Sequence, residues 1–203
     1  MAITNYGTLK TAVSNWMAET LTTDVEDIIA FAQDHINSRL RHREMNTQTD
    51  LSPTSGVFTL PADYLQWRNV VELSTYRRKL THVSKMAADA RWPTSPSGLG
   101  CDFSIEGNSL TVYPTITNDI ELSYYTRLAA FSGASENDTD WLLTKRPSVY
   151  LRACQMVASQ LLHDDAAEDR HRGFVNDAIE ELNNESLMSE FANTGIVQTS
   201  YAP

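Results

Sequence analysis

Residues 103–113 decide how the middle of the chain folds, and their sequence is Phe103-Ser104-Ile105-Glu106-Gly107-Asn108-Ser109-Leu110-Thr111-Val112-Tyr113. Apolar and polar side chains alternate on both sides of Gly107-Asn108, a pair that favours a tight two-residue turn. A period of two places one set of side chains on a single face of each strand. The stretch therefore predicts a β-hairpin with one buried face.

The same composition extends over residues 46–128, where prolines and glycines separate short runs of β-branched and aromatic residues. Further strands are predicted at 57–60, 68–73 and 119–126. A short helix is predicted over 84–91, with Ser84 as its N-cap. We interpret the whole region as a β-rich module.

The segments on either side of this region show helical periodicity. Residues 1–45 predict two helices joined by a short polar connection, a hairpin that favours antiparallel packing. In residues 129–191, Pro147 suits the first turn of a central helix on whose apolar face Cys154 lies. A last helix is predicted from residue 166 to 191. Its expected apolar stripe is Phe174, Ala178, Ile179, Leu182 and Leu187.

The order of helices, strands and helices predicts an α+β fold with segregated layers. We expect mainly an α-helical bundle, with a small β-rich module inserted between the second and third long helices. The expected parts are a helical hairpin at 1–45, the module at 46–128, the remaining bundle helices at 129–191 and a C-terminal arm at 192–203. The arm has no helical period, and both a frayed terminus and a segment docked on a neighbour are open.

Composition and charge exclude several classes of function. The 203 residues include 16 Lys plus Arg against 26 Asp plus Glu, a formal charge of -10. This balance argues against general affinity for nucleic acid, which needs clustered positive charge. No apolar stretch is long enough for a membrane helix, and the N-terminus has no secretory pattern. We therefore expect no membrane association and synthesis in a cytoplasm.

The sequence contains no catalytic motif, so we expect no catalytic residues, no cofactor and no metal site. The five histidines are scattered, and His163-Asp164-Asp165 is better interpreted as a solvated helix end than as a metal site, because adjacent helical residues point in different directions. Cys101 lies in a loop without an identifiable base, which favours an ordinary thiol.

Two charged clusters are candidates for interaction. Arg39, Arg41 and Arg43 end the second predicted helix, and Arg39 and Arg43 are expected to share a helical face. The cluster suits either a helix C-terminus favoured by the macrodipole or an interface with an acidic surface. From Asp164 to Glu190 there are nine acidic residues against two arginines. A solvated helix face is the ordinary explanation of such a charge run.

The chain as a whole resembles the head-to-tail adaptor (connector) proteins of short-tailed phages. The resemblance covers nearly all of residues 1–190 in the same order, and the tail after Phe191 shows no resemblance. Each similar segment is weak alone, and together they make the resemblance fairly specific. The segments are Thr4-Asn5-Tyr6-Gly7-Thr8-Leu9-Lys10 through Val13 and Trp16, Ile36 to Met45, Leu60-Pro61-Ala62-Asp63-Tyr64-Leu65, Leu122-Ser123-Tyr124-Tyr125-Thr126-Arg127, and Asn137 to Pro147.

The resemblance implies a structural virion protein at the head–tail junction, assembled in the host cytoplasm and without catalysis. Such proteins form a ring beneath the portal protein, usually of about twelve copies, that extends the DNA channel and docks tail (nozzle or fibre) proteins. DNA passes through without sequence-specific binding. The alternatives are a tail-completion or tail-nozzle protein, a DNA-packaging accessory protein, a host adaptor that stays a monomer or dimer, and a small hydrolase.

The candidate site residues follow from this resemblance and from charge. The expected subunit or portal interface is Arg39, Arg41, Arg43, Ile196, Val197 and Tyr201. The expected acidic lumen or inter-subunit seam is Asp177, Glu180, Glu181 and Glu185. An acidic lumen repels phosphate and keeps duplex DNA mobile.

Overall fold

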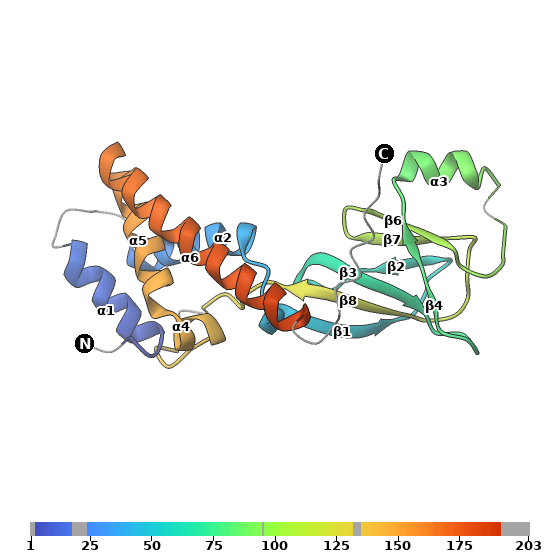
Figure 1. The fold of residues 1–203 in the computed structure, drawn as a ribbon, viewed down its shortest axis with the longest axis horizontal. Helices are drawn as coiled ribbons and strands as arrows, with labels where there is room; N and C mark the ends of the chain where they lie inside the picture. The colour runs from blue at the N-terminus through green and yellow to red at the C-terminus, as the bar shows by residue number, and fades with distance from the viewer. Residues whose placement is uncertain (1–2, 18–23, 95, 132–134, 192–203) are drawn as a thin grey trace. The chain divides into compact units, whose positions relative to one another are not determined.

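The computed structural model describes residues 3–17, 24–94, 96–131 and 135–191. These residues form six α-helices, one 3-10 helix and eight β-strands (Figure 1). In chain order the elements are α1 (Tyr6–Met17), α2 (Val25–Arg39), η1 (Arg43–Met45), β1 (Asn46–Leu51), β2 (Val57–Thr59), β3 (Tyr64–Glu72), β4 (Arg78–Lys79), β5 (Thr81–His82), α3 (Lys85–Arg91), β6 (Asp102–Glu106), β7 (Ser109–Tyr113), β8 (Ile120–Thr126), α4 (Trp141–Lys145), α5 (Pro147–Leu161) and α6 (Asp165–Phe191).

The chain divides into two compact units. The helical unit combines Met1–Glu44 with Leu128–Pro203, and the β unit is Met45–Arg127. In Figure 1 the blue, orange and red helices belong to the helical unit, whereas the cyan to yellow strands and the green helix α3 belong to the β unit.

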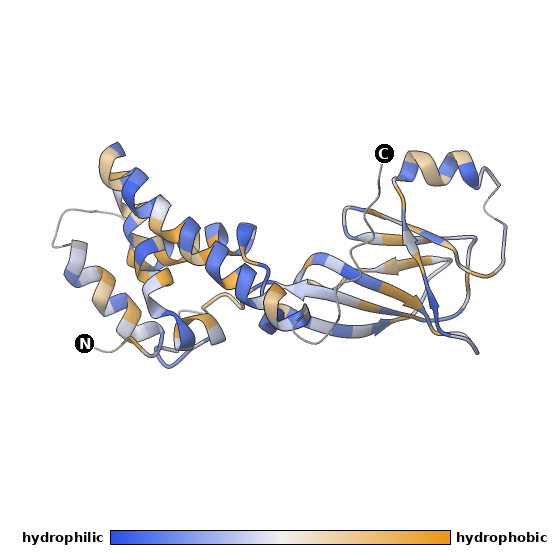
Figure 2. Ribbon diagram, viewed as in Figure 1, coloured by the Kyte–Doolittle hydropathy of each residue, from blue (hydrophilic) through white to orange (hydrophobic). Residues whose placement is uncertain are grey.

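Helix α5 is the centre of the helical unit and contacts α1, α2, α4 and α6. Pro147 lies in its first turn, as predicted, where the missing N–H breaks no helical hydrogen bond. Tyr150 and Cys154 are fully buried on this helix. Burial raises the pKa of the Cys154 thiol to about 12, so it remains protonated and packs as a small apolar group. The helices of this unit alternate between apolar and polar residues along their length, as helices with one buried face do (Figure 2).

A partly buried polar cluster joins three segments of the helical unit. The Tyr150 hydroxyl donates to Asp140 Oδ2, and Asp140 Oδ1 caps α4 by accepting from Leu143 N at 2.7 Å. Gln33 Nε2 donates to the carbonyl of Ala129 at 2.7 Å. Desolvation raises the pKa of Asp140 and of Tyr150. The cluster ties α2 and α5 to the segment that leads into α4.

The β unit contains two four-stranded sheets, with strand orders β1-β8-β3-β4 and β2-β7-β6-β5. The described strand pairs are antiparallel except β5 and β6, which are parallel. The predicted hairpin is confirmed: β6 and β7 pair from Asp102–Tyr113 to Glu106–Ser109. Gly107 has a φ of 56° in the turn, a conformation that favours glycine. The predicted Ser84 N-cap of α3 is also confirmed, since Ser84 Oγ accepts from Ala87 N.

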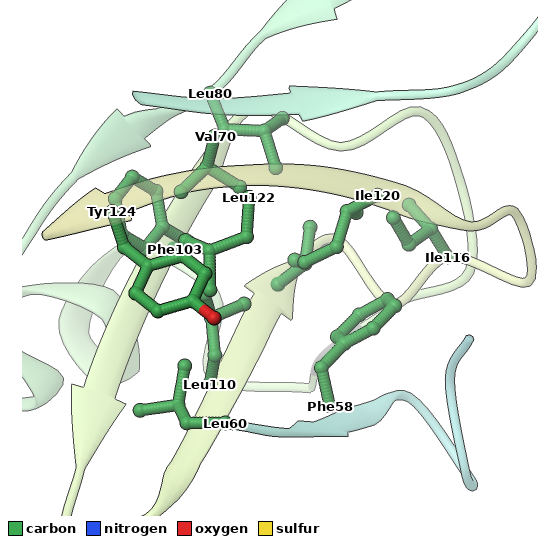
Figure 3. Packing of buried hydrophobic residues seen from close by; sticks show 11 residues of the cluster. Phe58, Leu60, Val70, Leu80, Phe103, Leu110, Ile116, Ile120, Leu122 and Tyr124 are labelled. Carbon is green, nitrogen blue, oxygen red and sulfur yellow. The ribbon is translucent and has the colours of Figure 1, made fainter. Parts of the chain in front are cut away.

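Apolar side chains from both sheets form the core of the β unit (Figure 3). Phe58 and Phe103 are the largest fully buried side chains of this core. The buried members of the core are Phe58, Leu60, Val70, Leu80, Phe103, Leu110, Val112, Ile116, Ile120, Leu122 and Tyr124. This set lies entirely within the β unit, which therefore has a hydrophobic core of its own.

Two buried carboxylates attach loops and helix α3 to strands of the β unit. Glu72 accepts from Gly100 N at 3.2 Å and from Asn118 Nδ2 at 2.8 Å, which fixes two loops on the end of β3. Asp102 Oδ2 accepts from Arg91 Nη1 at 2.7 Å and from Trp92 Nε1 at 3.1 Å. The second carboxylate therefore attaches the C-terminal end of α3 to β6.

The expected fold class, mainly a helical bundle with a small inserted β-rich module, was wrong. The strands in the middle of the chain form a compact unit with two sheets, its own helix α3 and its own core, and the C-terminal part is helical. The error arose because β1, β4 and β5 were not predicted. These strands complete the two sheets, so the region is a compact unit distinct from the helical one.

Candidate functional site

Of the predicted interface arginines, only Arg39 belongs to α2. The helix ends at Arg39, and the next residue, Leu40, is extended with φ -74° and ψ 128°. Arg43 begins the 3-10 helix η1. The expectation that Arg39 and Arg43 share a helical face was therefore wrong.

Residues 39–43, which we call the α2 exit strap, run along α6 and are held there by polar side chains. The contacts are Arg39 Nη1 to Asn176 Oδ1 (2.7 Å), Arg41 N to Asn183 Oδ1 (2.7 Å), Asn183 Nδ2 to Arg39 O (3.2 Å) and Arg43 N to Ser186 Oγ (2.9 Å). Three of the four involve the strap backbone, which has left the helix and needs new partners. The polar residues of α6 therefore satisfy this backbone.

The arginine side chains differ in what they do within the unit. The Arg41 guanidinium donates to the carbonyls of Asn37 at 2.9 Å and Leu40 at 2.6 Å, at the C-terminal end of α2. This contact is the favourable interaction of a cation with a helix C-terminus. Arg39 bonds to Asn176, and the Arg43 side chain is exposed. Two of the three guanidinium groups thus act within the helical unit.

His42 lies in the middle of the strap and is buried. Its ring stacks on Trp141 at 4.7 Å between centroids, and its Nδ1 accepts from Glu44 N at 3.2 Å. Its Nε2 is buried without a hydrogen-bond partner. Burial is the main cause that lowers the pKa of His42, and it does the same for His35 and His171. All three histidines belong to the helical unit.

The predicted acidic residues are all exposed on α6. Glu181 pairs with Arg146, with 3.0 Å between Oε1 and Nη2. Asp177 and Glu180 form no ion pair with the described residues. With Gly173 and Asn184 they follow a spacing of four, three and four, which defines one helical face. We call these four residues the outer stripe.

The outer stripe faces away from the buried side of α6, which carries His171, Val175, Ile179, Leu182 and Ser186. The predicted apolar stripe was wrong at Phe174 and Leu187, because both are about half exposed, at 52% and 50%. Phe174 contacts the guanidinium of Arg152 with its ring. The predicted contact residues Ile196, Val197 and Tyr201, and the arm at 192–203, lie outside the described residues.

A basic surface on the β unit was not among the predicted charged sites. The turn from β3 to β4 contains Tyr76, which is 83% exposed, followed by Arg77, Arg78 and Lys79. Arg77 pairs with Glu121 on β8. Arg78 and Lys79 form β4, an exposed strand at the edge of its sheet. The signal was visible as the run of three successive cations in an acidic chain.

Other chemistry is limited among the residues that the structure covers. No group of three or more His, Cys, Asp or Glu side chains there could hold a metal ion. Cys101 is exposed and unpaired as a disulfide, and Cys154 is buried. Across the described helices, none combines the length and apolar character that crossing a membrane requires.

Comparison with curated proteins finds no match. A family model described as SU10 adaptor protein matches residues 4–199, which is nearly the whole chain and includes most of the arm that had shown no resemblance. The match confirms the resemblance to phage head-to-tail adaptors. The chain therefore belongs to the SU10 adaptor protein family and is a phage structural adaptor, a virion component that interacts with portal and tail components.

Proposed function

We propose that this protein forms a ring beneath the portal, where it extends the DNA channel and provides the docking surface for nozzle or fibre proteins of the tail. The match of the adaptor family over residues 4–199 carries this proposal. The ring would contain about twelve copies, each making the same contact with the next. No catalytic step is needed in this role.

Charge supports a role as a DNA conduit. The formal charge is -10, and Asp177, Glu180, Glu181 and Glu185 are exposed on α6. Negative charge along a channel repels phosphate, whereas clustered lysine and arginine would retain the duplex through counterion release. In the ring, these four acids would line the lumen or an inter-subunit seam.

The exit strap and the C-terminal arm are the proposed contacts with the portal or a neighbouring subunit. Arg39 and Arg43 are both exposed, but the side chains of Arg39 and Arg41 carry hydrogen bonds within the helical unit, which leaves Arg43 as the better candidate for docking. Ile196, Val197 and Tyr201 are the candidate contacts of the arm. Replacing Arg43 by Ala, which removes none of the strap's described hydrogen bonds, separates a docking role from a folding role.

Mass photometry of the full chain with and without the portal ring of the same phage tests the proposal. The free chain has a mass of 22.8 kDa. We expect the portal peak to gain the mass of about twelve chains, because a closed ring matches the symmetry of its template. Binding to purified tail proteins without binding to the portal would instead identify a tail-completion or nozzle protein. Failure to bind either one would overturn the proposal.

A further inference from the structure

The β3–β4 tip, residues 76–79, is a compact positive surface on an acidic protein. The turn is held by Ser74 Oγ, which donates to Tyr76 O at 2.8 Å. Arg77 is neutralised by Glu121, whereas Arg78 and Lys79 are exposed and form no ion pair within the described part of the chain. Two uncompensated cations therefore lie next to one exposed aromatic ring.

The outer stripe of α6 has the complementary properties. Asp177 and Glu180 are exposed acids without ion pairs among the described residues, on one face with Gly173 and Asn184. A Cβ atom built on Gly173 would meet nothing within 4 Å. Glycine inside a helix is less stable than alanine, so the unit itself gives no reason for glycine here. A bare backbone at this place permits close approach by another molecule.

Both surfaces are short. Gly173 and Glu180 are seven residues apart on a helix, which corresponds to about 10 Å. The β3–β4 tip consists of Tyr76 and Arg77 in the turn and the two-residue strand β4. One exposed ring and two exposed cations therefore stand opposite one bare helical position and two exposed carboxylates.

We propose that the β3–β4 tip of one copy docks on the outer stripe of α6 of a second copy. The inference rests on the proposed ring, because a contact between two different surfaces joins copies head to tail and closes a ring when the rotation fits. Opposite charge on the two surfaces sets the register and disfavours other pairings. A DNA phosphate is the competing partner for the tip, but it would leave the bare glycine of α6 without a role.

Charge reversal on the portal-templated ring tests the contact. The tip variant is Arg78→Glu with Lys79→Glu, and the stripe variant is Asp177→Lys with Glu180→Lys. Arg77 and Glu181 are unchanged because both form ion pairs within their own units. Each variant alone should need at least about tenfold more protein to fill the portal ring, because like charges then meet at every junction.

Mixing the two variants is the decisive measurement. An acidic tip fits a basic stripe and a basic tip fits an acidic stripe, so alternating copies restore complementarity at every junction. The mixture should fill the ring at the wild-type concentration. Gly173→Ala should raise the melting temperature of the free chain and weaken ring filling, because the added methyl group favours the helix but occupies the approach.

Matched controls change the same charge elsewhere. Arg127→Glu, and Glu106→Lys with Asp50→Lys, alter exposed residues that lie outside both surfaces and form no ion pair among the described residues, and they should leave ring filling unchanged. Normal rings from folded tip and stripe variants would overturn the inference, as would rescue in a chain carrying both reversals but not in the mixture. Normal rings with lost affinity for a DNA duplex would assign the tip to DNA. If the wild-type chain forms no ring on the portal, the proposed function itself fails.

Discussion

Asn183 holds the α2 exit strap through both ends of its amide, so replacing it by alanine should destabilise the helical unit. Asn183 Oδ1 accepts from Arg41 N at 2.7 Å, and Asn183 Nδ2 donates to Arg39 O at 3.2 Å. Each hydrogen bond contributes about 1 kcal/mol. Alanine regains about 0.6 kcal/mol of helix propensity. The expected loss in free energy of unfolding is therefore about 1.5 kcal/mol.

Asn184 provides a matched control because it is the same residue type one position further along α6. Its side chain is exposed, and no hydrogen bond of this side chain is found within the described residues. Asn184→Ala should stabilise the chain by about 0.6 kcal/mol through helix propensity alone. The two variants should differ by about 2 kcal/mol, and propensity cancels in this difference.

Urea unfolding followed by circular dichroism at a helical wavelength measures both variants. The shift should be confined to the transition of the helical unit if the two units unfold separately. Asn183→Asp keeps an acceptor for Arg41 N and loses the donor to Arg39 O, so its stability should lie between those of wild type and Asn183→Ala. A difference below about 0.5 kcal/mol between the two alanine variants would refute the role of the strap contacts.

Three further perturbations act on other parts of the fold. His35, His42 and His171 have lowered pKa values when folded. The stability they contribute is therefore complete above their unfolded pKa of about 6.5 and is lost as pH falls through the folded pKa values. Melting temperatures measured from pH 7.5 down to pH 5.0 should decrease, and an increase would contradict this sign. Phe58→Ala should cost about 3–5 kcal/mol and lower the unfolding transition of the β unit, measured by urea titration, because Phe58 is fully buried. Asp102→Ala removes the acceptor of Arg91 and Trp92, and limited proteolysis should then cut near α3 faster than in wild type; unchanged cleavage would show that α3 is held by other contacts.

The parts of the fold that the sequence predicted correctly are governed by local chemistry. Gly107-Asn108, Ser84 and Pro147 each act through their own backbone conformation or a hydrogen bond within one turn. Such signals do not depend on distant parts of the chain. The hairpin, the cap of α3 and the start of α5 therefore followed directly from their residues.

The parts that were missed depend on partners far along the chain. β1 has the sequence Asn46-Thr47-Gln48-Thr49-Asp50-Leu51, which is almost wholly polar and forms a strand by pairing with β8. On α6, Ser186 is buried because it accepts from Arg43 N, while the apolar Leu187 beside it is half exposed. Hydrophobic periodicity cannot detect a helix face that binds a backbone segment through polar side chains.

The same limit applied to the candidate site. A run of arginines identifies positive charge in the sequence. The carbonyls at the end of α2 that accept hydrogen bonds from Arg41 can be identified only when the end of the helix is known. The Arg77-Arg78-Lys79 run was not predicted as a site because no strand was predicted at 78–79. Exposure at a sheet edge makes this run the more accessible basic surface.

The polypeptide passes between its two compact units twice, and the two passages are hydrogen-bonded neighbours. Asn46 pairs with Tyr125, and Thr126 Oγ1 donates to Met45 O at 3.1 Å. On the other side of the boundary, Leu128 N donates to Asn37 Oδ1 at 2.9 Å. Any mechanical load transmitted from one unit to the other is therefore shared by two strands, and torsion must strain the bonds between them. A single connecting strand would swivel freely under the same torque.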